Sequence, residues 1–134
     1  MKMTPQVVFD GQCEEAFKFY EQALGAKVTF MLTWASSPMA SEAPEGWGHR
    51  ILHATLEFGD SILQGGDGFP GQPYQAPRGF SILVSVTDPA QAERIFNALA
   101  QQGTVVAPLQ KTFWSKLYGA VKDRFGLSWD INCD

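Results

Sequence analysis

Residues 110–134, QKTFWSKLYGAVKDRFGLSWDINCD, combine a turn signal with an alternating apolar pattern, and this stretch decides the fold. The segment KDRFG, residues 122–126, predicts a turn, because Asp123 can bond its own backbone and Gly126 tolerates a positive φ angle. Residues 114–121 and 127–132 flank the turn and are typical of strands. The stretch therefore predicts a β-hairpin.

The second strand of this hairpin has one apolar and one polar face. Along residues 127–132, Leu127, Trp129 and Ile131 alternate with Ser128, Asp130 and Asn132. A period of two puts each set on its own face of the strand. The polar face either borders a polar cavity or faces water, and the sequence leaves both interpretations open.

Composition indicates one ordinary globular domain. The chain has 134 residues, of which 45% are hydrophobic, and a formal net charge of −4. Its ten Lys and Arg residues are scattered, so we expect neither nucleic acid nor a membrane surface as a partner. No apolar run has the length of a membrane span or the core of a signal peptide. We therefore expect a cytoplasmic location.

Two cysteines are too few for a disulfide framework, and they form no CxxC pair for a metal or redox site. Cys13 stands near an expected helix start. It is either a thiol with a lowered pKa or a small buried side chain.

The first half of the chain predicts one helix and four strands. We expect strands at residues 4–10, 27–34, 49–58 and 61–64, a helix at 12–24, and a loop at 35–48. The helix carries an apolar stripe of Ala16, Phe19, Tyr20, Ala23 and Leu24, and Gly25 ends it.

The second half repeats this order. A glycine- and proline-rich loop at residues 65–79 precedes an expected strand at 80–87. Asp88 then caps a helix that has Pro89 at its first position, and a strand at 104–111 leads into the hairpin. The stripe of this helix comprises Ala92, Ile95, Phe96 and Leu99.

The two helix stripes indicate an internal duplication. Ala16 and Tyr20 each precede their counterparts, Ala92 and Phe96, by 76 positions. We therefore predict an α+β fold of two βαβββ modules, whose curved mixed β-sheets enclose a cleft with the helices outside. The modules, residues 1–68 and 79–134, are joined by the loop at 65–79 within a single domain, residues 1–134.

Three segments carry a resemblance to a known family: FDGQCEEAFKFYEQALGA (9–26), HATLEFGDSILQGGD (53–67) and LQKTFWSKLYGAVKDRFGLSWDIN (109–132). They resemble the PhnB-like subfamily of the vicinal oxygen chelate superfamily, which includes glyoxalase I, extradiol dioxygenases and the fosfomycin and bleomycin resistance proteins. PhnB-like members often bear a demethylubiquinone methyltransferase label.

The resemblance implies a divalent metal site in the metal-dependent members, built from first-strand ligands and one carboxylate on each last strand. Asp130 matches the last-strand carboxylate, whereas Ser81 stands where the second module should offer histidine. We therefore expect a degenerate metal site and no cofactor, with Asp130 and His53 as the only candidate ligands. His49 and His53, spaced four apart on one expected strand, would share a face, and Arg50 would point away from it toward solvent or an interface.

These observations favour a protein that binds a small molecule, aromatic or cationic, in a cleft lined by His53, Trp114, Tyr118 and Asp130. The alternative is an enzyme: a metal-dependent lyase, isomerase or dioxygenase using Asp130 and His53, or an acid/base catalyst using that pair without metal. A third hypothesis is a structural module with a filled cleft. We do not predict methyl transfer, because no glycine-rich loop follows a strand in an alternating β/α pattern. The resemblance also implies a homodimer, swapped or unswapped.

Overall fold

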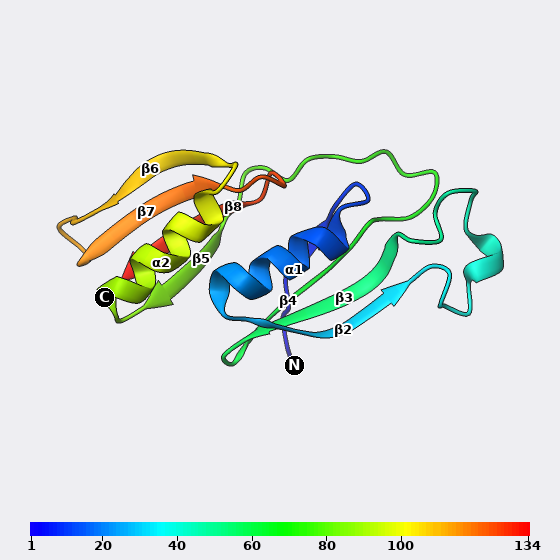
Figure 1. The fold of residues 1–134 in the computed structure, drawn as a ribbon, viewed down its shortest axis with the longest axis horizontal. Coiled ribbons are helices and arrows are strands. Elements are labelled where there is room, and N and C mark those ends of the chain that lie inside the picture. The colour runs from blue at the N-terminus through cyan, green and yellow to red at the C-terminus, as the bar shows by residue number, and fades with distance from the viewer. The chain divides into compact units, whose positions relative to one another are not determined.

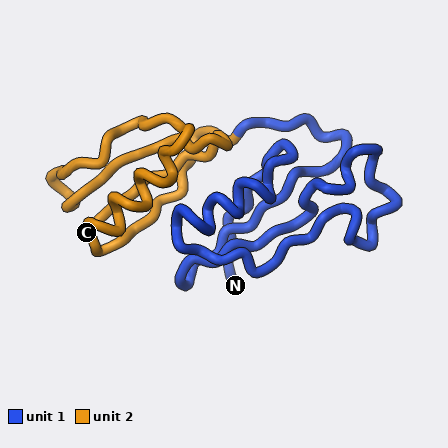
Figure 2. The backbone as a smooth tube through the Cα atoms, viewed as in Figure 1, with its two compact units in different colours: residues 1–76 blue, residues 77–134 orange.

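The computed structural model describes residues 1–134 as two compact units, Met1–Ala76 and Pro77–Asp134 (Figure 2). Each unit contains one long helix and one open sheet of four strands (Figure 1). The predicted α+β class with a repeated βαβββ order is confirmed. Neither helix is long and apolar enough to cross a membrane.

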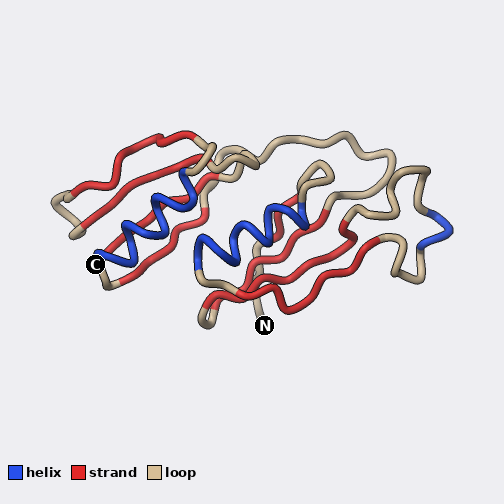
Figure 3. Tube along the Cα trace, in the orientation of Figure 1, coloured by secondary structure: helices blue, strands red, loops and turns tan.

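Unit one has the sheet order β1-β4-β3-β2. Its elements are β1 (Gln6–Val8), α1 (Cys13–Leu24), β2 (Lys27–Thr33), a 3₁₀ turn η1 (Ala40–Glu42), β3 (Ile51–Phe58) and β4 (Ser61–Gly66). β1 pairs with β4 in parallel, while the β2–β3 and β3–β4 pairs are antiparallel. The sheet is therefore mixed, and α1 lies along it (Figure 3).

Unit two repeats this topology, with the order β5-β8-β7-β6. Its elements are β5 (Ile82–Val86), α2 (Pro89–Ala100), β6 (Thr104–Gln110), β7 (Leu117–Lys122) and β8 (Ser128–Cys133). β5 pairs with β8 in parallel, and β7 and β8 form the predicted hairpin. The two units thus share strand order as well as element order.

The hairpin turn has the predicted chemistry. A carboxylate oxygen of Asp123 accepts hydrogen bonds from the backbone N–H groups of Phe125 at 2.8 Å and Leu127 at 3.1 Å. Its other oxygen accepts the indole N–H of Trp129 at 2.8 Å, and Gly126 has a φ of 89°. Asp123 therefore holds the turn and the first buried ring of β8 together.

Each helix packs an aromatic ring against a glycine of its sheet. A Cβ atom on Gly65 would lie 2.9 Å from the Phe17 ring, and one on Gly119 would lie 2.7 Å from the Phe96 ring. These contacts correct the predicted stripe of α1, because Phe17 is buried and Phe19 is only half-buried. The sequence spacing fits either phenylalanine, and the flat surface that Gly65 offers selects Phe17.

Two expected boundaries were wrong. Gly65 and Gly66 belong to β4 rather than to the following loop, because both pair with β1. β7 begins at Leu117 rather than at residue 114, because the Thr112 hydroxyl accepts a hydrogen bond from the Ser115 N–H at 3.1 Å and turns the chain.

Both cysteines are fully buried. Burial, followed by the negative charges of Asp67 and Glu14, raises the pKa of the Cys13 thiol. The interpretation of Cys13 as a small buried side chain is therefore confirmed, and the alternative of a lowered pKa is wrong.

Candidate functional site

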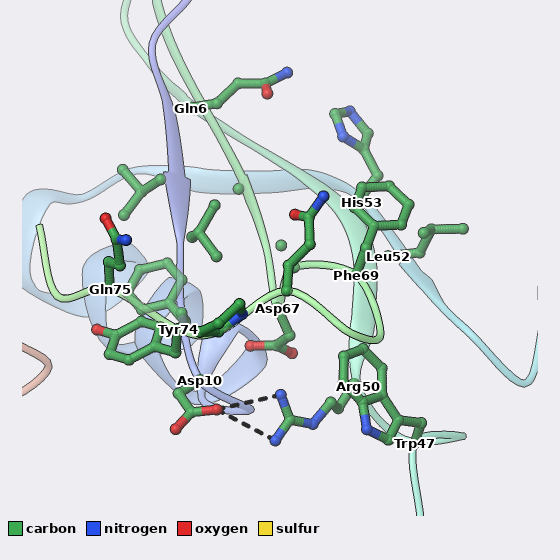
Figure 4. A pocket seen from close by; sticks show the side chains of 18 residues that line it. Gln6, Asp10, Trp47, Arg50, Leu52, His53, Asp67, Phe69, Tyr74 and Gln75 are labelled. Atoms are coloured by element: carbon green, nitrogen blue, oxygen red, sulfur yellow. Dashed lines mark hydrogen bonds and ion pairs between the residues drawn. The ribbon is translucent and has the colours of Figure 1, made fainter. Parts of the chain in front are cut away.

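A pocket of about 490 Å³ opens on the sheet of unit one (Figure 4). Its floor comes from β1, β3 and β4, and the loop at residues 68–75 forms a wall. The aromatic lining side chains are Phe9, Trp47, His53, Phe69 and Tyr74, and the uncharged amides are Gln6, Gln72 and Gln75. Arg50 is the only lysine or arginine in the lining.

A β-bulge places Arg50 and His53 at this pocket. Leu32 pairs with His53 and the next residue, Thr33, pairs with Ile51, so Leu52 is an extra residue in β3. The bulge reverses the alternation of the strand at its start: Ile51 and Ala54 are both buried, and Arg50 and His53 both line the pocket. The expectation that Arg50 points away from His53 was therefore wrong.

His49 is not part of the strand. It is exposed in the turn that precedes β3, so the expected shared face of His49 and His53 does not form. His53 is half-buried, and its ring centroid lies 5.8 Å from that of Phe30.

Asp67 fixes the chain at the bulge. This buried carboxylate accepts the N–H of Ile51 at 2.7 Å, and the N–H groups of Gly11 at 2.9 Å and Cys13 at 3.0 Å. The N–H of Asp67 in turn donates to the carbonyl of Ile51 at 2.8 Å. One side chain thus holds the entry to α1, the end of β4 and the start of β3, and both of its oxygens are occupied.

Arg50 lies between Asp10 and Trp47 at the pocket (Figure 4). Its guanidinium carbon is 4.5 Å from the centroid of the Trp47 ring, a cation–π distance. Two of its N–H groups donate to the same oxygen of Asp10, at 3.3 and 3.4 Å. The charge is therefore held in place by a stacked ring and a single carboxylate oxygen.

Aromatic packing supports the pocket from behind. The buried ring of Trp34 meets Trp47 and Phe69 edge to face, with centroids 5.9 and 5.8 Å apart. Trp34 thereby fixes two rings that the pocket exposes.

Tyr74 lines the other wall of the pocket. Partial burial and then the charge of Asp10 raise its pKa.

The other residues expected at the site gather on the polar face of the sheet in unit two. The Ser81 hydroxyl donates to Asp130 at 2.6 Å, and the rings of Trp114 and Tyr118 lie 5.5 Å apart. Partial burial, followed by the charge of Asp130 and hydrogen bonding to it, raises the pKa of Tyr118. Trp114, Tyr118 and Asp130 are therefore brought together within unit two, whereas His53 belongs to unit one.

The residues around Asp130 do not fit the metal centre of the metal-dependent superfamily members. Asp130 is flanked by the hydroxyl groups of Ser81 and Tyr118 rather than by imidazole, and Ser81 occupies one of its oxygens. Neither unit contains a group of three His, Cys, Asp or Glu side chains arranged to hold an ion. Neutral hydroxyl groups are poor ligands for zinc or nickel.

His53 is the one predicted site residue that lines this pocket, and the sequence analysis did not propose its other side chains as site residues. Phe69 and Tyr74 stand in the loop at residues 65–79, which was interpreted only as a linker. Two aromatic residues in a polar, glycine-rich loop were the available signal. Arg50 had no such signal, because its direction depends on the bulge.

Solved structures place this architecture in a known class. The crystal structure of protein PA1353 from Pseudomonas aeruginosa matches with a TM-score of 0.92 and 41% identity, and the match covers 100% of this chain and 98% of that one. The fosfomycin resistance protein FosX from Mesorhizobium loti matches with a TM-score of 0.62 and 9% identity over 100% and 91% of the chains. The chain therefore has the vicinal oxygen chelate fold.

The chain belongs to the PhnB-like family, whose model is described as 3-demethylubiquinone-9 3-methyltransferase and matches residues 1–132. The PhnB protein from Bacillus cereus has a TM-score of 0.83 and 23% identity, with complete coverage of both chains. Protein YjdN from Escherichia coli is 27% identical over 140 residues, covering 98% of this chain and 95% of YjdN.

Proposed function

We propose that this PhnB-like protein binds a small aromatic molecule in the pocket of unit one. The observation that carries the proposal is a space of about 490 Å³ lined by Trp47, Phe69 and Tyr74 together with three glutamines. Small-molecule sites have volumes of about 300–1,000 Å³ and combine apolar walls with a few polar groups. The glutamine amides offer both donors and acceptors to a ring substituent.

Trp47 makes the proposal measurable, because its ring lines the pocket while Trp34 and Trp129 are buried in the core, and Trp114→Phe removes the signal of the remaining, exposed tryptophan. A library of aromatic compounds is screened by tryptophan fluorescence, and each response is confirmed by calorimetry. Tyr74→Ala should raise the dissociation constant of a true ligand by about three- to tenfold, because one aromatic contact is lost. Phe19→Ala, a half-buried residue on α1 that does not line the pocket, is the matched control. Equal affinity in all three proteins would contradict the proposal.

We also propose that Trp114, Tyr118 and Asp130 contact a small molecule on the polar face of the sheet in unit two. The support is a pair of rings that meet edge to face beside a half-buried carboxylate on the polar face of that sheet. Tyr118→Phe and Asp130→Asn should each bind this molecule less tightly than the native protein does. Unchanged affinity in both variants would contradict a binding role for these residues.

The enzymatic alternative has less support. A metal-dependent lyase, isomerase or dioxygenase needs an ion at Asp130 and His53, and the donors around Asp130 do not suit one. We do not propose methyl transfer either. The two open mixed sheets provide no β-strand with a glycine-rich turn that opens a helix in a parallel sheet, as a Rossmann-type cofactor site requires.

A cytoplasmic homodimer is the proposed form of the protein. Apolar side chains stand exposed on unit two, where Leu83 is 58%, Val106 67% and Phe113 97% accessible. A second copy that covered these side chains would remove their apolar surface from water. Light scattering on the purified protein tests the dimer, and cell fractionation tests the location.

A further inference from the structure

Arg50 has a bonding capacity that the protein leaves largely unused. A guanidinium group has five N–H donors, and only two of them bond to protein, both to one oxygen of Asp10. The remaining donors stand at a pocket that is open to solvent. An anion with two oxygens would use the fork of the guanidinium group better than Asp10 does.

The pair between Arg50 and Asp10 is weak. Strong bonds between guanidinium and carboxylate groups have lengths of about 2.7–2.9 Å. The two bonds here are 3.3 and 3.4 Å long, and the Asp10 side chain is 58% exposed. A partly solvated pair of this length contributes little and exchanges readily with another carboxylate.

Trp47 keeps Arg50 in place when Asp10 is displaced. The guanidinium carbon lies over the Trp47 ring, 4.5 Å from its centroid, and this contact does not involve the carboxylate. Arg50 itself is only 22% exposed, so an ion bound to it is shielded from solvent better than one at Asp10.

The other acidic side chain of the pocket does not compete for Arg50. Both oxygens of Asp67 accept backbone N–H groups, at 2.7 to 3.0 Å, and Arg50 forms its ion pair with Asp10 instead. Its charge is opposed by those three N–H dipoles. Arg50 therefore sets the charge preference of the space beside the rings of Phe69 and Tyr74.

We propose that the ligand of this pocket is an aromatic carboxylate, and that Arg50 receives its carboxylate group in place of Asp10. The inference rests on the proposed binding function and names its ligand class. Phe69 and Tyr74 contact the ring, while the arginine fork determines the preference for an acid over a neutral or cationic analogue. Asp10 acts as an internal competitor for the same donors.

The test compares two probes of equal shape, naphthalene-2-carboxylate and naphthalene-2-carboxamide, by calorimetry on the native protein, Arg50→Gln, Arg50→Lys and Asp10→Asn. The acid should bind the native protein about ten- to a hundredfold more tightly than the amide, as charge-assisted bonds predict. Arg50→Gln should abolish this preference, and Arg50→Lys should restore only part of it, because lysine keeps the charge without the fork. Asp10→Asn should bind the acid more tightly than the native protein does and should bind the amide with unchanged affinity.

The outcomes separate the two proposals. Equal binding of acid and amide by the native protein would overturn the carboxylate assignment and leave the aromatic pocket standing. A preference that survives in Arg50→Gln would place the charge recognition elsewhere and also overturn it. Failure of both probes to bind would contradict the binding function itself. Circular dichroism of each variant shows whether a lost preference comes from unfolding.

Discussion

The hydroxyl oxygen of Ser81 lies 2.6 Å from a carboxylate oxygen of Asp130, so the expected last-strand metal ligand bonds to the serine that directly precedes β5. A short hydrogen bond of this kind satisfies the carboxylate and stabilises it without an ion. The polar face of β8 is thus a hydrogen-bonded wall that also includes Tyr118. Asn132 on the same face has a buried carbonyl oxygen without a hydrogen-bond partner.

The first prediction concerns metal binding at this wall. Zinc, manganese, nickel and iron(II) should show no stoichiometric binding to protein purified without a histidine tag, because Asp130 is surrounded by hydroxyl donors. Elemental analysis and calorimetric titration measure it, and Asp130→Asn should give the same titration as the native protein. One ion per chain, lost in both Asp130→Asn and His53→Ala, would establish the metal-dependent alternative.

The second prediction concerns the titration of Tyr118. Its pKa is raised from the usual value of about 10, because partial burial and Asp130 both favour the neutral phenol. The corresponding contribution to stability is complete below about pH 10 and decreases as the pH rises further, since the folded state then retains more protons. Ultraviolet difference absorbance follows the phenolate, with Tyr118→Phe identifying its signal. Asp130→Asn should lower the pKa of Tyr118, and an unchanged titration would contradict the role of the carboxylate.

The third prediction concerns Asp67. Asp67→Asn should lower the free energy of unfolding by about 2–4 kcal/mol, because an amide NH₂ then faces a buried backbone N–H that has lost its acceptor. Urea unfolding followed by circular dichroism measures the change. Asp60→Asn, in the exposed turn between β3 and β4, serves as control and should change stability by less than about 0.5 kcal/mol. Equal midpoints for the two variants would show that the three bonds to Asp67 are not needed.

The fourth prediction concerns the contact of α2 with its sheet. Gly119→Ala should lower the free energy of unfolding by about 1–3 kcal/mol, because the new Cβ atom would lie 2.7 Å from the Phe96 ring and 2.9 Å from the Leu109 backbone. Gly48→Ala is the matched control, since its Cβ atom meets nothing closer than Ala35 at 3.4 Å. If Gly119→Ala and the control had equal free energies of unfolding, α2 would be able to shift without loss of stability.

Local signals in the sequence were sufficient for most of the fold. Asp88 accepts the N–H of Ala90 at 3.1 Å as a helix cap, and Gly25 ends α1 with a φ of 70°, as each residue type favours. Asp123 and Gly126 likewise form the predicted hairpin turn. These features depend on a few neighbouring residues, so their chemistry is readable without the rest of the chain. The choice of Phe17 over Phe19 as the buried ring could not be read from local sequence, because it depends on Gly65 in a distant strand.

The sequence by itself determined the two βαβββ units and the grouping of Asp130 with Tyr118 and Trp114, because turn chemistry, apolar period and strand alternation are local properties. The family was indicated separately, by the resemblance of residues 9–26, 53–67 and 109–132. The tertiary structure alone decided the pocket. Arg50 faces it because Leu52 is an extra residue in the pairing of β3 with β2 and because Asp67 holds Ile51 from the end of β4. A bulge belongs to the register between two strands, and neither strand encodes it in isolation.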